Sequence, residues 1–229
     1  MLGVLVNTAT VISGSLIGLI FKKGIPQKYT KAIMTGIGLC TVAIGILGLS
    51  DGTNILVLIF SIILGAFLGT LLDIDKGIEN LGKFVDNKFK SKNRSASVAE
   101  GFVTASLLFC VGSMTIVGSL KSGISGDNTM IFTKSLLDFI SSIMLSVSLG
   151  IGVLVSGLFV FAFQGALVLF SGILAPFLTD VAIAEISCVG SLMILALGFN
   201  LLGITKIKVA NYLPAIIIAP IIVYIINLF

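Results

Sequence analysis

Residues 55–72 read ILVLIFSIILGAFLGTLL and contain no charged side chain. Wound as an α-helix, a run of this length and apolarity can cross the hydrocarbon core of a bilayer, which needs about 20 residues. The run is continuously apolar, whereas the strands of a membrane β-barrel alternate between apolar and polar residues. This stretch therefore predicts an integral membrane protein built from helices.

The composition of the whole chain agrees with a bilayer environment. Of its 229 residues, 57% are hydrophobic and 10% are charged, with a mean hydropathy of +1.20, whereas soluble domains carry about 25% charged residues. The chain has no histidine, which excludes His-dependent triads and His-ligated zinc or haem. Cys40, Cys110 and Cys188 stand singly in apolar runs and are expected to be buried free thiols. We expect neither a metal site nor a cofactor.

Eight apolar runs, including the first, have the length and composition of membrane helices. Their approximate limits are 2–21, 32–49, 54–72, 101–120, 130–149, 152–173, 183–204 and 209–228. The predicted fold class is all-α, a polytopic transmembrane helix bundle of seven to eight spans that forms a single domain over residues 1–229. The boundary at 149–152 has only glycines as turn signals, so two helices or one re-entrant break are both open there.

The basic residues sort to one side of the membrane when successive loops are assigned to opposite sides. Twelve of the fourteen Lys and Arg residues fall on that side. They are Lys22, Lys23, Lys28, Lys31, Lys76, Lys83, Lys88, Lys90, Lys92, Arg94, Lys206 and Lys208. Because Lys-rich loops stay in the cytoplasm, we expect a multi-pass protein of the bacterial plasma (inner) membrane with its basic loops cytoplasmic. Both termini lie outside if eight segments cross. No nucleic-acid partner is needed to explain the basic residues.

Residues 73–100 form the longest polar stretch of the chain. Ile78, Leu81, Val85 and Phe89 recur there at helical spacing, which predicts a short amphipathic helix on the cytoplasmic membrane face. We interpret this stretch as a cytoplasmic amphipathic connector whose basic residues contact anionic lipid headgroups. A regulatory role is the alternative.

Short sequence words recur in the two halves of the chain. Residues 3–6 and 152–155 both read GVLV, at an offset of 149, and Cys40 and Cys188 lie 148 residues apart. The predicted limits are 1–72 for a first three-helix unit, 101–149 for a central helix pair and 150–229 for a second three-helix unit. The first and sixth spans are an odd number of crossings apart, so the two units would point in opposite directions. Inverted repeats of this kind are typical of secondary transporters.

Several segments also carry a family resemblance. They are Val6–Asn7, Gly14–Gly18, Leu72–Asp75, Leu108–Leu120, Gly126–Asn128, Lys134–Asp138, Gly150–Ser156, Gln164–Gly165, Gly198–Leu202 and Lys208–Pro220. Over nearly its whole length the chain resembles an uncharacterised bacterial inner-membrane family, domain of unknown function 554, of YdfK- and YqgA-like proteins. That family often has Pro where Ser113 stands. The resemblance implies a multi-span plasma-membrane protein and no particular activity.

Two charges lie inside an apolar run. Asp138 stands eight residues into the run 130–149, and Lys134 precedes it by one helical turn on the same face. An isolated charge at that depth costs about 3 kcal/mol or more, but the two residues can neutralise each other. Asp138 is a candidate cation or proton carrier, with Lys134 as its switching partner or as an anion contact. The alternative is a structural lock near the outer end of the helix.

Three amides lie deep in other spans. Asn7 and Gln164 occupy matching helices of the predicted repeat, and Asn200 lies in the run 183–204. Amides in a dry interior need hydrogen-bond partners. Together with Lys134 and Asp138 they are predicted to bind a solute or ion, or else to bond neighbouring helices.

The last run contains helix-breaking residues. Asn211, Pro214 and Pro220 interrupt it, and a proline frees the carbonyl one turn earlier, here those of Ala210 and Ile216. Broken helices of this kind coordinate ions in transporters. A simple kink is the alternative.

Other polar and small residues are expected to have structural roles. Glu185 is interpreted as a solvated charge at the outer rim, and Asp127 or Asn128 as the cap of the following helix. Gly14–Gly18 and Gly65–Gly69 have the GxxxG spacing, which favours close helix packing or a homodimer.

These features favour a secondary transporter or permease for a small solute or monovalent ion, working by alternating access. The alternative is a passive channel, or a structural or partner-binding membrane protein that transports nothing. No enzymatic activity is expected, because no base, nucleophile and orienting group stand at interpretable spacing.

Overall fold

The computed structural model describes residues 1–22, 27–80 and 98–227, and its secondary structure in these ranges is helical, without strands. The elements are α1 (Leu2–Lys22), α2 (Gln27–Leu49), α3 (Ile55–Leu71), α5 (Val98–Cys110), α6 (Ser113–Ile124), α7 (Thr129–Leu149), α8 (Ile151–Leu169), α9 (Ser171–Leu174), α10 (Asp180–Leu201), the 3-10 helix η1 (Val209–Tyr212) and α11 (Pro214–Ile226). A further short helix, Ile74–Asn80, follows α3. The prediction of an all-α helix bundle is confirmed.

Local sequence signals set several of the helix ends. Asn54 accepts a hydrogen bond from the amide of Leu56 at the start of α3, and Thr179 accepts one from Ala182 at the start of α10. Gly150, at φ +76°, ends α7 and starts α8, a backbone conformation that favours glycine. The two helices are therefore separated by a single residue.

The described helices provide six to eight membrane spans. Six are long and apolar enough to cross by themselves, and the number reaches eight if each of two bent helix pairs is one span. Both α7 and α8 belong to the six, so the boundary at 149–152 separates two span-length helices. The bends lie elsewhere: 55° between α3 and Ile74–Asn80, and 59° between α5 and α6.

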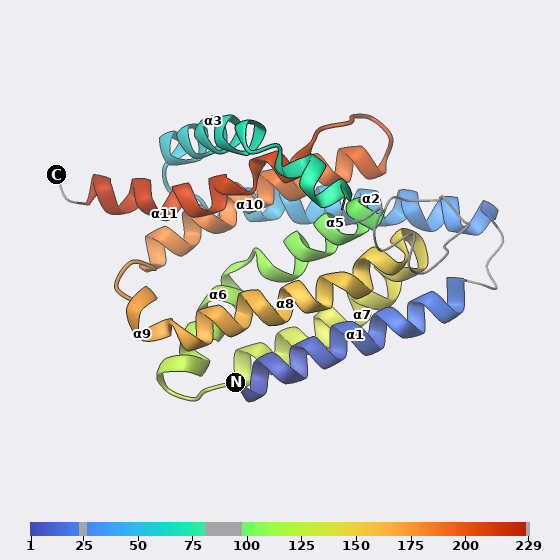
Figure 1. Ribbon diagram of the computed structural model, residues 1–229, viewed down its shortest axis with the longest axis horizontal. Coiled ribbons are helices and arrows are strands. Elements are labelled where there is room, and N and C mark those ends of the chain that lie inside the picture. Colours follow the sequence, from blue (N-terminus) through green and yellow to red (C-terminus); the bar gives the residue numbers. More distant parts are fainter. Residues whose placement is uncertain (23–26, 81–97, 228–229) are drawn as a thin grey trace.

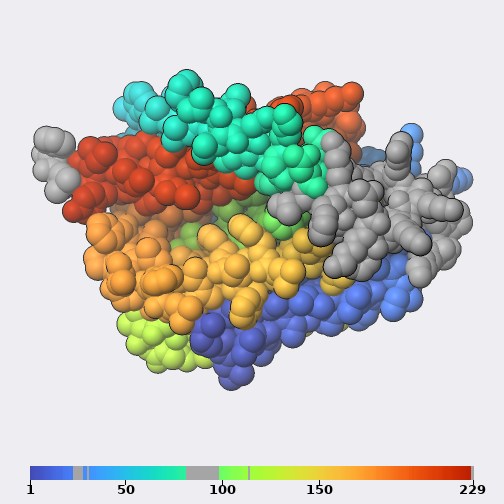
Figure 2. Space-filling model, viewed as in Figure 1, coloured from blue at the N-terminus to red at the C-terminus, as the bar shows by residue number. Residues whose placement is uncertain are grey.

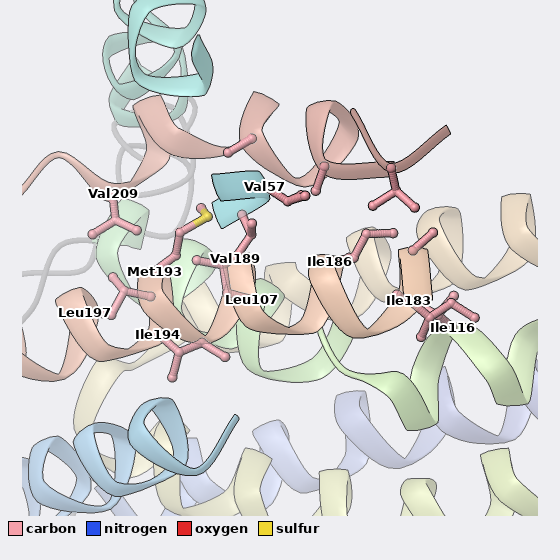
Figure 3. Packing of buried hydrophobic residues seen from close by; sticks show 14 of the residues in the cluster. Val57, Leu107, Ile116, Ile183, Ile186, Val189, Met193, Ile194, Leu197 and Val209 are labelled. Atoms are coloured by element: carbon pink, nitrogen blue, oxygen red, sulfur yellow. The ribbon is translucent and has the colours of Figure 1, made fainter. Parts of the chain in front are cut away.

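The apolar core surrounds α10, the most deeply buried of the six span-length helices. Its side chains Ile186, Val189 and Met193 pack with Val57 of α3 on one side and with Leu107 of α5 on another (Figure 3). In the ribbon view α3 and α11 lie on one flank of α10, whereas α1, α7 and α8 lie on the opposite flank (Figure 1). Burial on all sides explains why α10 is apolar around its whole circumference.

The outer surface of the bundle is also apolar. Large exposed hydrophobic side chains occur on α1, α2, α3, α7, α8 and α11. Of these helices, α1, α3 and α8 form much of the face that Figure 2 shows. Examples are Ile20, Phe21, Leu47, Phe67, Leu158 and Ile217. Cys40 is exposed as well, so the expectation of three buried thiols is wrong for this residue and correct for Cys110 and Cys188. Such a surface suits lipid, which removes the need to bury these side chains.

Glycines bring paired helices into backbone contact. In the antiparallel pair α2 and α10, Gly38 faces Leu202 and Gly45 faces Leu195. In the antiparallel pair α3 and α11, Gly65 faces Ala215. These pairs join helices that the predicted repeat equates, although the repeat itself stays a prediction.

Helix ends from distant parts of the chain lie together at the two ends of the bundle (Figure 1). The start of α1 and the end of α11 lie toward one end of the bundle, whereas the end of α1, the starts of α2 and α5 and the connection from α10 to α11 lie toward the other (Figure 1). The connector 73–100 is described only at its two ends. Eight of its named residues lie outside the described residues, as does Lys23: Leu81, Lys83, Val85, Lys88, Phe89, Lys90, Lys92 and Arg94.

The α2–α10 contact yields a stability test. A Cβ at Gly45 would lie 2.7 Å from the backbone nitrogen of Leu195, whereas a Cβ at Gly36 of the same helix meets nothing within 4 Å. We expect Gly45→Val to destabilise the protein by about 1–3 kcal/mol, as overpacking does, and Gly36→Val to leave it unchanged. Thermal unfolding of both variants in detergent checks this, and equal melting temperatures would refute the contact.

Candidate functional site

Four of the five predicted solute-site residues meet inside the bundle. The Lys134 Nζ donates to both carboxylate oxygens of Asp138, at 2.7 Å each. The Asn7 Nδ2 donates to the Asp138 Oδ2 at 3.1 Å and to the Gln164 Oε1 at 3.2 Å. Helices α1, α7 and α8 thus contribute to one polar cluster, which we call the Asp138 cluster: Asn7, Lys134, Asp138 and Gln164.

The Asp138 cluster is almost completely removed from the surface. Asn7 and Gln164 are 0% exposed, Asp138 is 5% exposed and Lys134 is 7% exposed. The two charges cancel, and the ammonium also lies 5.9 Å from the centre of the Phe109 ring, within the range of a cation–π contact. Removing either partner of such a pair leaves a buried charge uncompensated, which costs about 3–5 kcal/mol.

Small residues on α1 explain how Asn7 reaches Asp138. A Cβ at Gly14 would lie 2.6 Å from the carbonyl oxygen of Phe139, and one at Gly18 would meet the carbonyl of Ile143. The backbones of α1 and the parallel α7 therefore touch. Inside the chain, α7 packs against the GxxxG motif at Gly14–Gly18, and α11 and η1 pack against the motif at Gly65–Gly69. Neither motif is therefore free to form a dimer.

A cavity of about 450 Å³ adjoins the Lys134–Asp138 pair. It lies between α2, α7, α10 and the bend that joins α5 to α6. Its polar lining residues are Asp51, Thr115, Lys134, Asp138, Ser187 and Ser191. Asp51 belongs to the turn after α2, so the cavity extends from the end of the bundle that holds the chain termini to the buried ion pair.

The bend beside this cavity is a break in a predicted continuous helix. Residues 101–120 were expected to form one span, but α5 ends at Cys110 and α6 starts at Ser113. Gly112 is extended, and the Thr115 hydroxyl donates to the carbonyl of Phe109 across the break, at 2.9 Å.

Asn200, the fifth predicted site residue, lies away from the Asp138 cluster. Its side chain holds the connection between α10 and η1, donating to the carbonyl of Ile207 and accepting from Ile207 N and Thr205 Oγ1. It lines a separate pocket of about 310 Å³ with Lys206 and Lys208. Its contacts therefore make it a loop-holding residue.

The three broken-helix candidates lie near α3 and α10. Pro214 occupies the first turn of α11 directly after η1, and the carbonyl of Ala210, predicted to be free, accepts from Leu213 N at 3.2 Å. Pro220 lies inside α11. The Asn211 Oδ1 accepts from the amide of Asp75 at 2.8 Å. None of the three is among the described residues that line the cavity beside Asp138.

Polar residues before α7 tie three helices together. Asp127 accepts from Thr129 N, and this hydrogen bond holds the pKa of its carboxyl below the usual value. Asn128 instead accepts from the Gly3 amide of α1 and from the Ser122 hydroxyl of α6. The predicted capping role therefore falls to Asp127, whereas Asn128 joins helices.

Glu185 is a functional candidate that the sequence reasoning misplaced. The expectation of a solvated rim charge is wrong, because Glu185 is 0% exposed. Its Oε1 accepts from the amide of Thr53 at 2.7 Å, the hydroxyl of Thr53 at 2.8 Å and the amide of Asn54 at 2.7 Å. The carboxylate thus sits at the N-terminus of α3, where the helix dipole favours an anion. Only the folded chain brings α10 to this turn.

Substitutions test how much Glu185 contributes to the stability of the fold. We expect Glu185→Ala to lower the free energy of unfolding by about 2–4 kcal/mol, because hydrogen bonds to a charged acceptor each contribute about 1.5–3 kcal/mol. Glu185→Gln keeps an acceptor oxygen and should cost less. Asp180→Ala, at an exposed position in the first turn of the same helix, is the matched control and should cost under about 1 kcal/mol. If Asp180→Ala lowered the melting temperature most, the result would contradict a stabilising role for the hydrogen bonds of Glu185 to Thr53 and Asn54.

Apolar spans, a lipid-compatible surface and few charges within the described helices define a multi-span membrane protein. Residues 2–224 match the family model described as "Protein of unknown function (DUF554)", and the chain belongs to this family. It is 36% identical to an uncharacterized membrane protein of Bacillus subtilis, YdfK, over all of this chain and 98% of that one. It is 29% identical to an uncharacterized protein of Escherichia coli, YqgA, over 95% and 94% of the two chains. No solved structure matches it.

Proposed function

We propose that this protein is a small secondary transporter that moves a small solute or ion across the bacterial plasma membrane by alternating access. The observation that supports this most is the buried Asp138 cluster beside a cavity of about 450 Å³. Ionisable residues inside a membrane bundle commonly mark the path of a substrate or ion. The cavity has a largely apolar lining, and Lys134 and Asp138 are its buried charges, so a solute that enters it can reach the ion pair.

The helix packing supports an inverted repeat around this cavity. Helices α2 and α10, which the repeat equates, both line it, and so do the central elements α5–α6 and α7. Glycine contacts show that α1 is parallel to α7, because Gly3 lies beside Asn128 and Gly18 beside Ile143. They also show that α8 is parallel to α5–α6, because Gly152 lies beside Val98 and Val168 beside Gly123. In inverted-repeat transporters the substrate site lies at such an interface.

The proposed transport step is an exchange of partners at Asp138. In the resting arrangement Lys134 and Asn7 bind its carboxylate. An arriving cationic group takes the place of Lys134, and the freed ammonium needs a new partner within the cavity. Because a buried charge without a partner is costly, the exchange couples solute binding to a rearrangement of α7 against α1 and α8.

We propose that the basic loops face the cytoplasm, by the positive-inside rule. The chain termini, Asp51 and the entrance of the cavity beside it then face outward. Labelling by a membrane-impermeant maleimide tests this in a Cys40→Ala background. Lys121→Cys, in the outer half of the topology, should react in intact cells, whereas Lys206→Cys should react only after the membrane is opened. The reverse pattern would invert the orientation.

The competing candidate is a passive channel or a structural or partner-binding membrane protein. The ion pair favours it, because Lys134 and Asp138 already satisfy each other. The Asn7 Oδ1 and the Gln164 Nε2 of the same cluster have no hydrogen-bond partner among the described residues. In that case the pair locks α7 into the bundle and carries nothing. We propose no enzymatic activity and no cofactor. A homodimer remains a proposal whose contact surface would have to exclude the two GxxxG motifs.

Flux measurements separate the two candidates. In proteoliposomes with an imposed solute, proton or sodium gradient, we expect measurable uptake by the unaltered protein and at least a tenfold loss in Asp138→Asn. Asp127→Asn, the same exchange at an exposed loop position, is the control and should retain uptake.

The melting temperature of each flux variant is measured in parallel. Lost uptake in a folded Asp138→Asn variant supports transport. Unchanged uptake with a lowered melting temperature, or no uptake by the unaltered protein under any gradient, supports the structural role.

A further inference from the structure

We infer that the cavity beside Asp138 binds a small zwitterion, a solute that carries a carboxylate and an ammonium group a few bonds apart. This inference rests on the proposed function for its site and adds the class of substrate. It follows from the charges, the helix end and the unpartnered hydroxyl that line one cavity.

The first argument is charge balance. Lys134 and Asp138 both line the cavity, and each is the other's charged partner at 2.7 Å. A lone cation that bound Asp138 would leave the Lys134 ammonium unpaired, and a lone anion that bound Lys134 would leave the Asp138 carboxylate unpaired. A zwitterion supplies a partner to both residues at once. It is the class of solute that can separate the pair without leaving a buried charge uncompensated.

The second argument is the helix end that faces the same space. Helix α6 has 12 residues, and its N-cap, Gly112, is extended and provides no side-chain cap. Gly112, Met114 and Thr115 line the cavity. The first amides of a helix carry the positive end of its dipole. Of those beside the cavity, the amide of Thr115 already donates to the carbonyl of Gly112 at 3.0 Å. Together with Lys134 this helix end forms a place for a carboxylate, as half-helix N-termini do in transporters with broken helices.

A buried hydroxyl supplies an independent observation. Ser187 of α10 is 2% exposed and lines the cavity, and its Oγ has no hydrogen-bond partner among the described residues. A polar group buried without a partner costs free energy that a bound polar solute would recover. Ser187 shares this lining with residues of α6 and α7, so its hydroxyl offers a third polar contact for the solute.

The carboxylates and the volume of the cavity also suit a small zwitterion. Asp138 at the inner end and Asp51 at the turn after α2 are the carboxylates of the described lining, and either can receive an ammonium group. The volume, about 450 Å³, lies at the lower end of the range for small-molecule sites, about 300–1,000 Å³. A small amino acid or betaine is therefore a suitable occupant.

Binding to the purified full-length protein in detergent tests the inference. The zwitterionic probes are glycine, L-alanine and glycine betaine; propionate carries the carboxylate alone and ethylamine the ammonium alone. By calorimetry we expect at least one zwitterion to bind at least tenfold more tightly than propionate and ethylamine. Equal binding of either single-charge probe, or binding of none of the zwitterions, would overturn the inference.

Matched serine variants locate the bound probe. Ser187→Ala should weaken zwitterion binding about 3- to 10-fold. Ser61→Ala, which removes a hydroxyl that is equally buried and unpartnered but lies on α3 outside the cavity lining, should bind as the unaltered protein does. Equal effects of the two substitutions would overturn the placement. The double variant Lys134→Gln with Asp138→Asn, which leaves no unpaired charge, should lose zwitterion binding while it stays folded.

Proteoliposome flux distinguishes a failed inference from a failed proposal for transport. Asp138-dependent flux of protons or sodium without zwitterion binding would refute the zwitterion and leave transport standing. Zwitterion binding that needs Ser187 but produces no flux would refute transport and leave the binding site standing.

Discussion

The ion pair of Lys134 and Asp138 is the constraint around which half of the bundle is organised. Two opposite charges in a dry interior must stay within bonding distance, and the remaining acceptor capacity of the carboxylate must be met. Asn7 meets it from α1 and in turn bonds Gln164 of α8. Helices α1, α7 and α8 are therefore joined at one depth. A shift of any of them along its axis would break a buried polar contact.

The same helices can come close enough only because small residues remove side chains from the contacts. Gly14 and Gly18 place α1 against the backbone of α7, and Gly45 does the same for α2 against α10. Within lipid there is no hydrophobic force between helices, so such close packing and the buried hydrogen bonds supply the specificity. Glu185 adds a charged clamp between α10 and the start of α3. The cavity remains where α2, α10, α7 and the broken α5–α6 pair do not close.

Much of this arrangement could be predicted, and the failures have physical causes. The runs of apolar residues predicted the spans, and the four-residue spacing of Lys134 and Asp138 predicted their pairing on one helix face. Asn7 and Gln164 were expected to share a role, and they share a hydrogen bond. Asn200 was grouped with them because it is an amide in an apolar run, but its depth was misjudged: it lies at the last turn of α10 and binds the following loop. The break at Gly112 was missed because the local run stays apolar through it.

The sequence by itself determined that this protein is a helical membrane protein, because hydropathy acts locally and additively along the chain. Only the tertiary structure decided which polar groups became partners. Glu185 shows why: as a lone carboxylate near a helix start it suits the water-facing rim, and it is buried only because α10 brings it to the amides of Thr53 and Asn54, 132 and 131 residues away. Whether a charge is solvated, paired or set beside a cavity depends on which helices pack against it, and that depends on contacts between segments far apart in the chain.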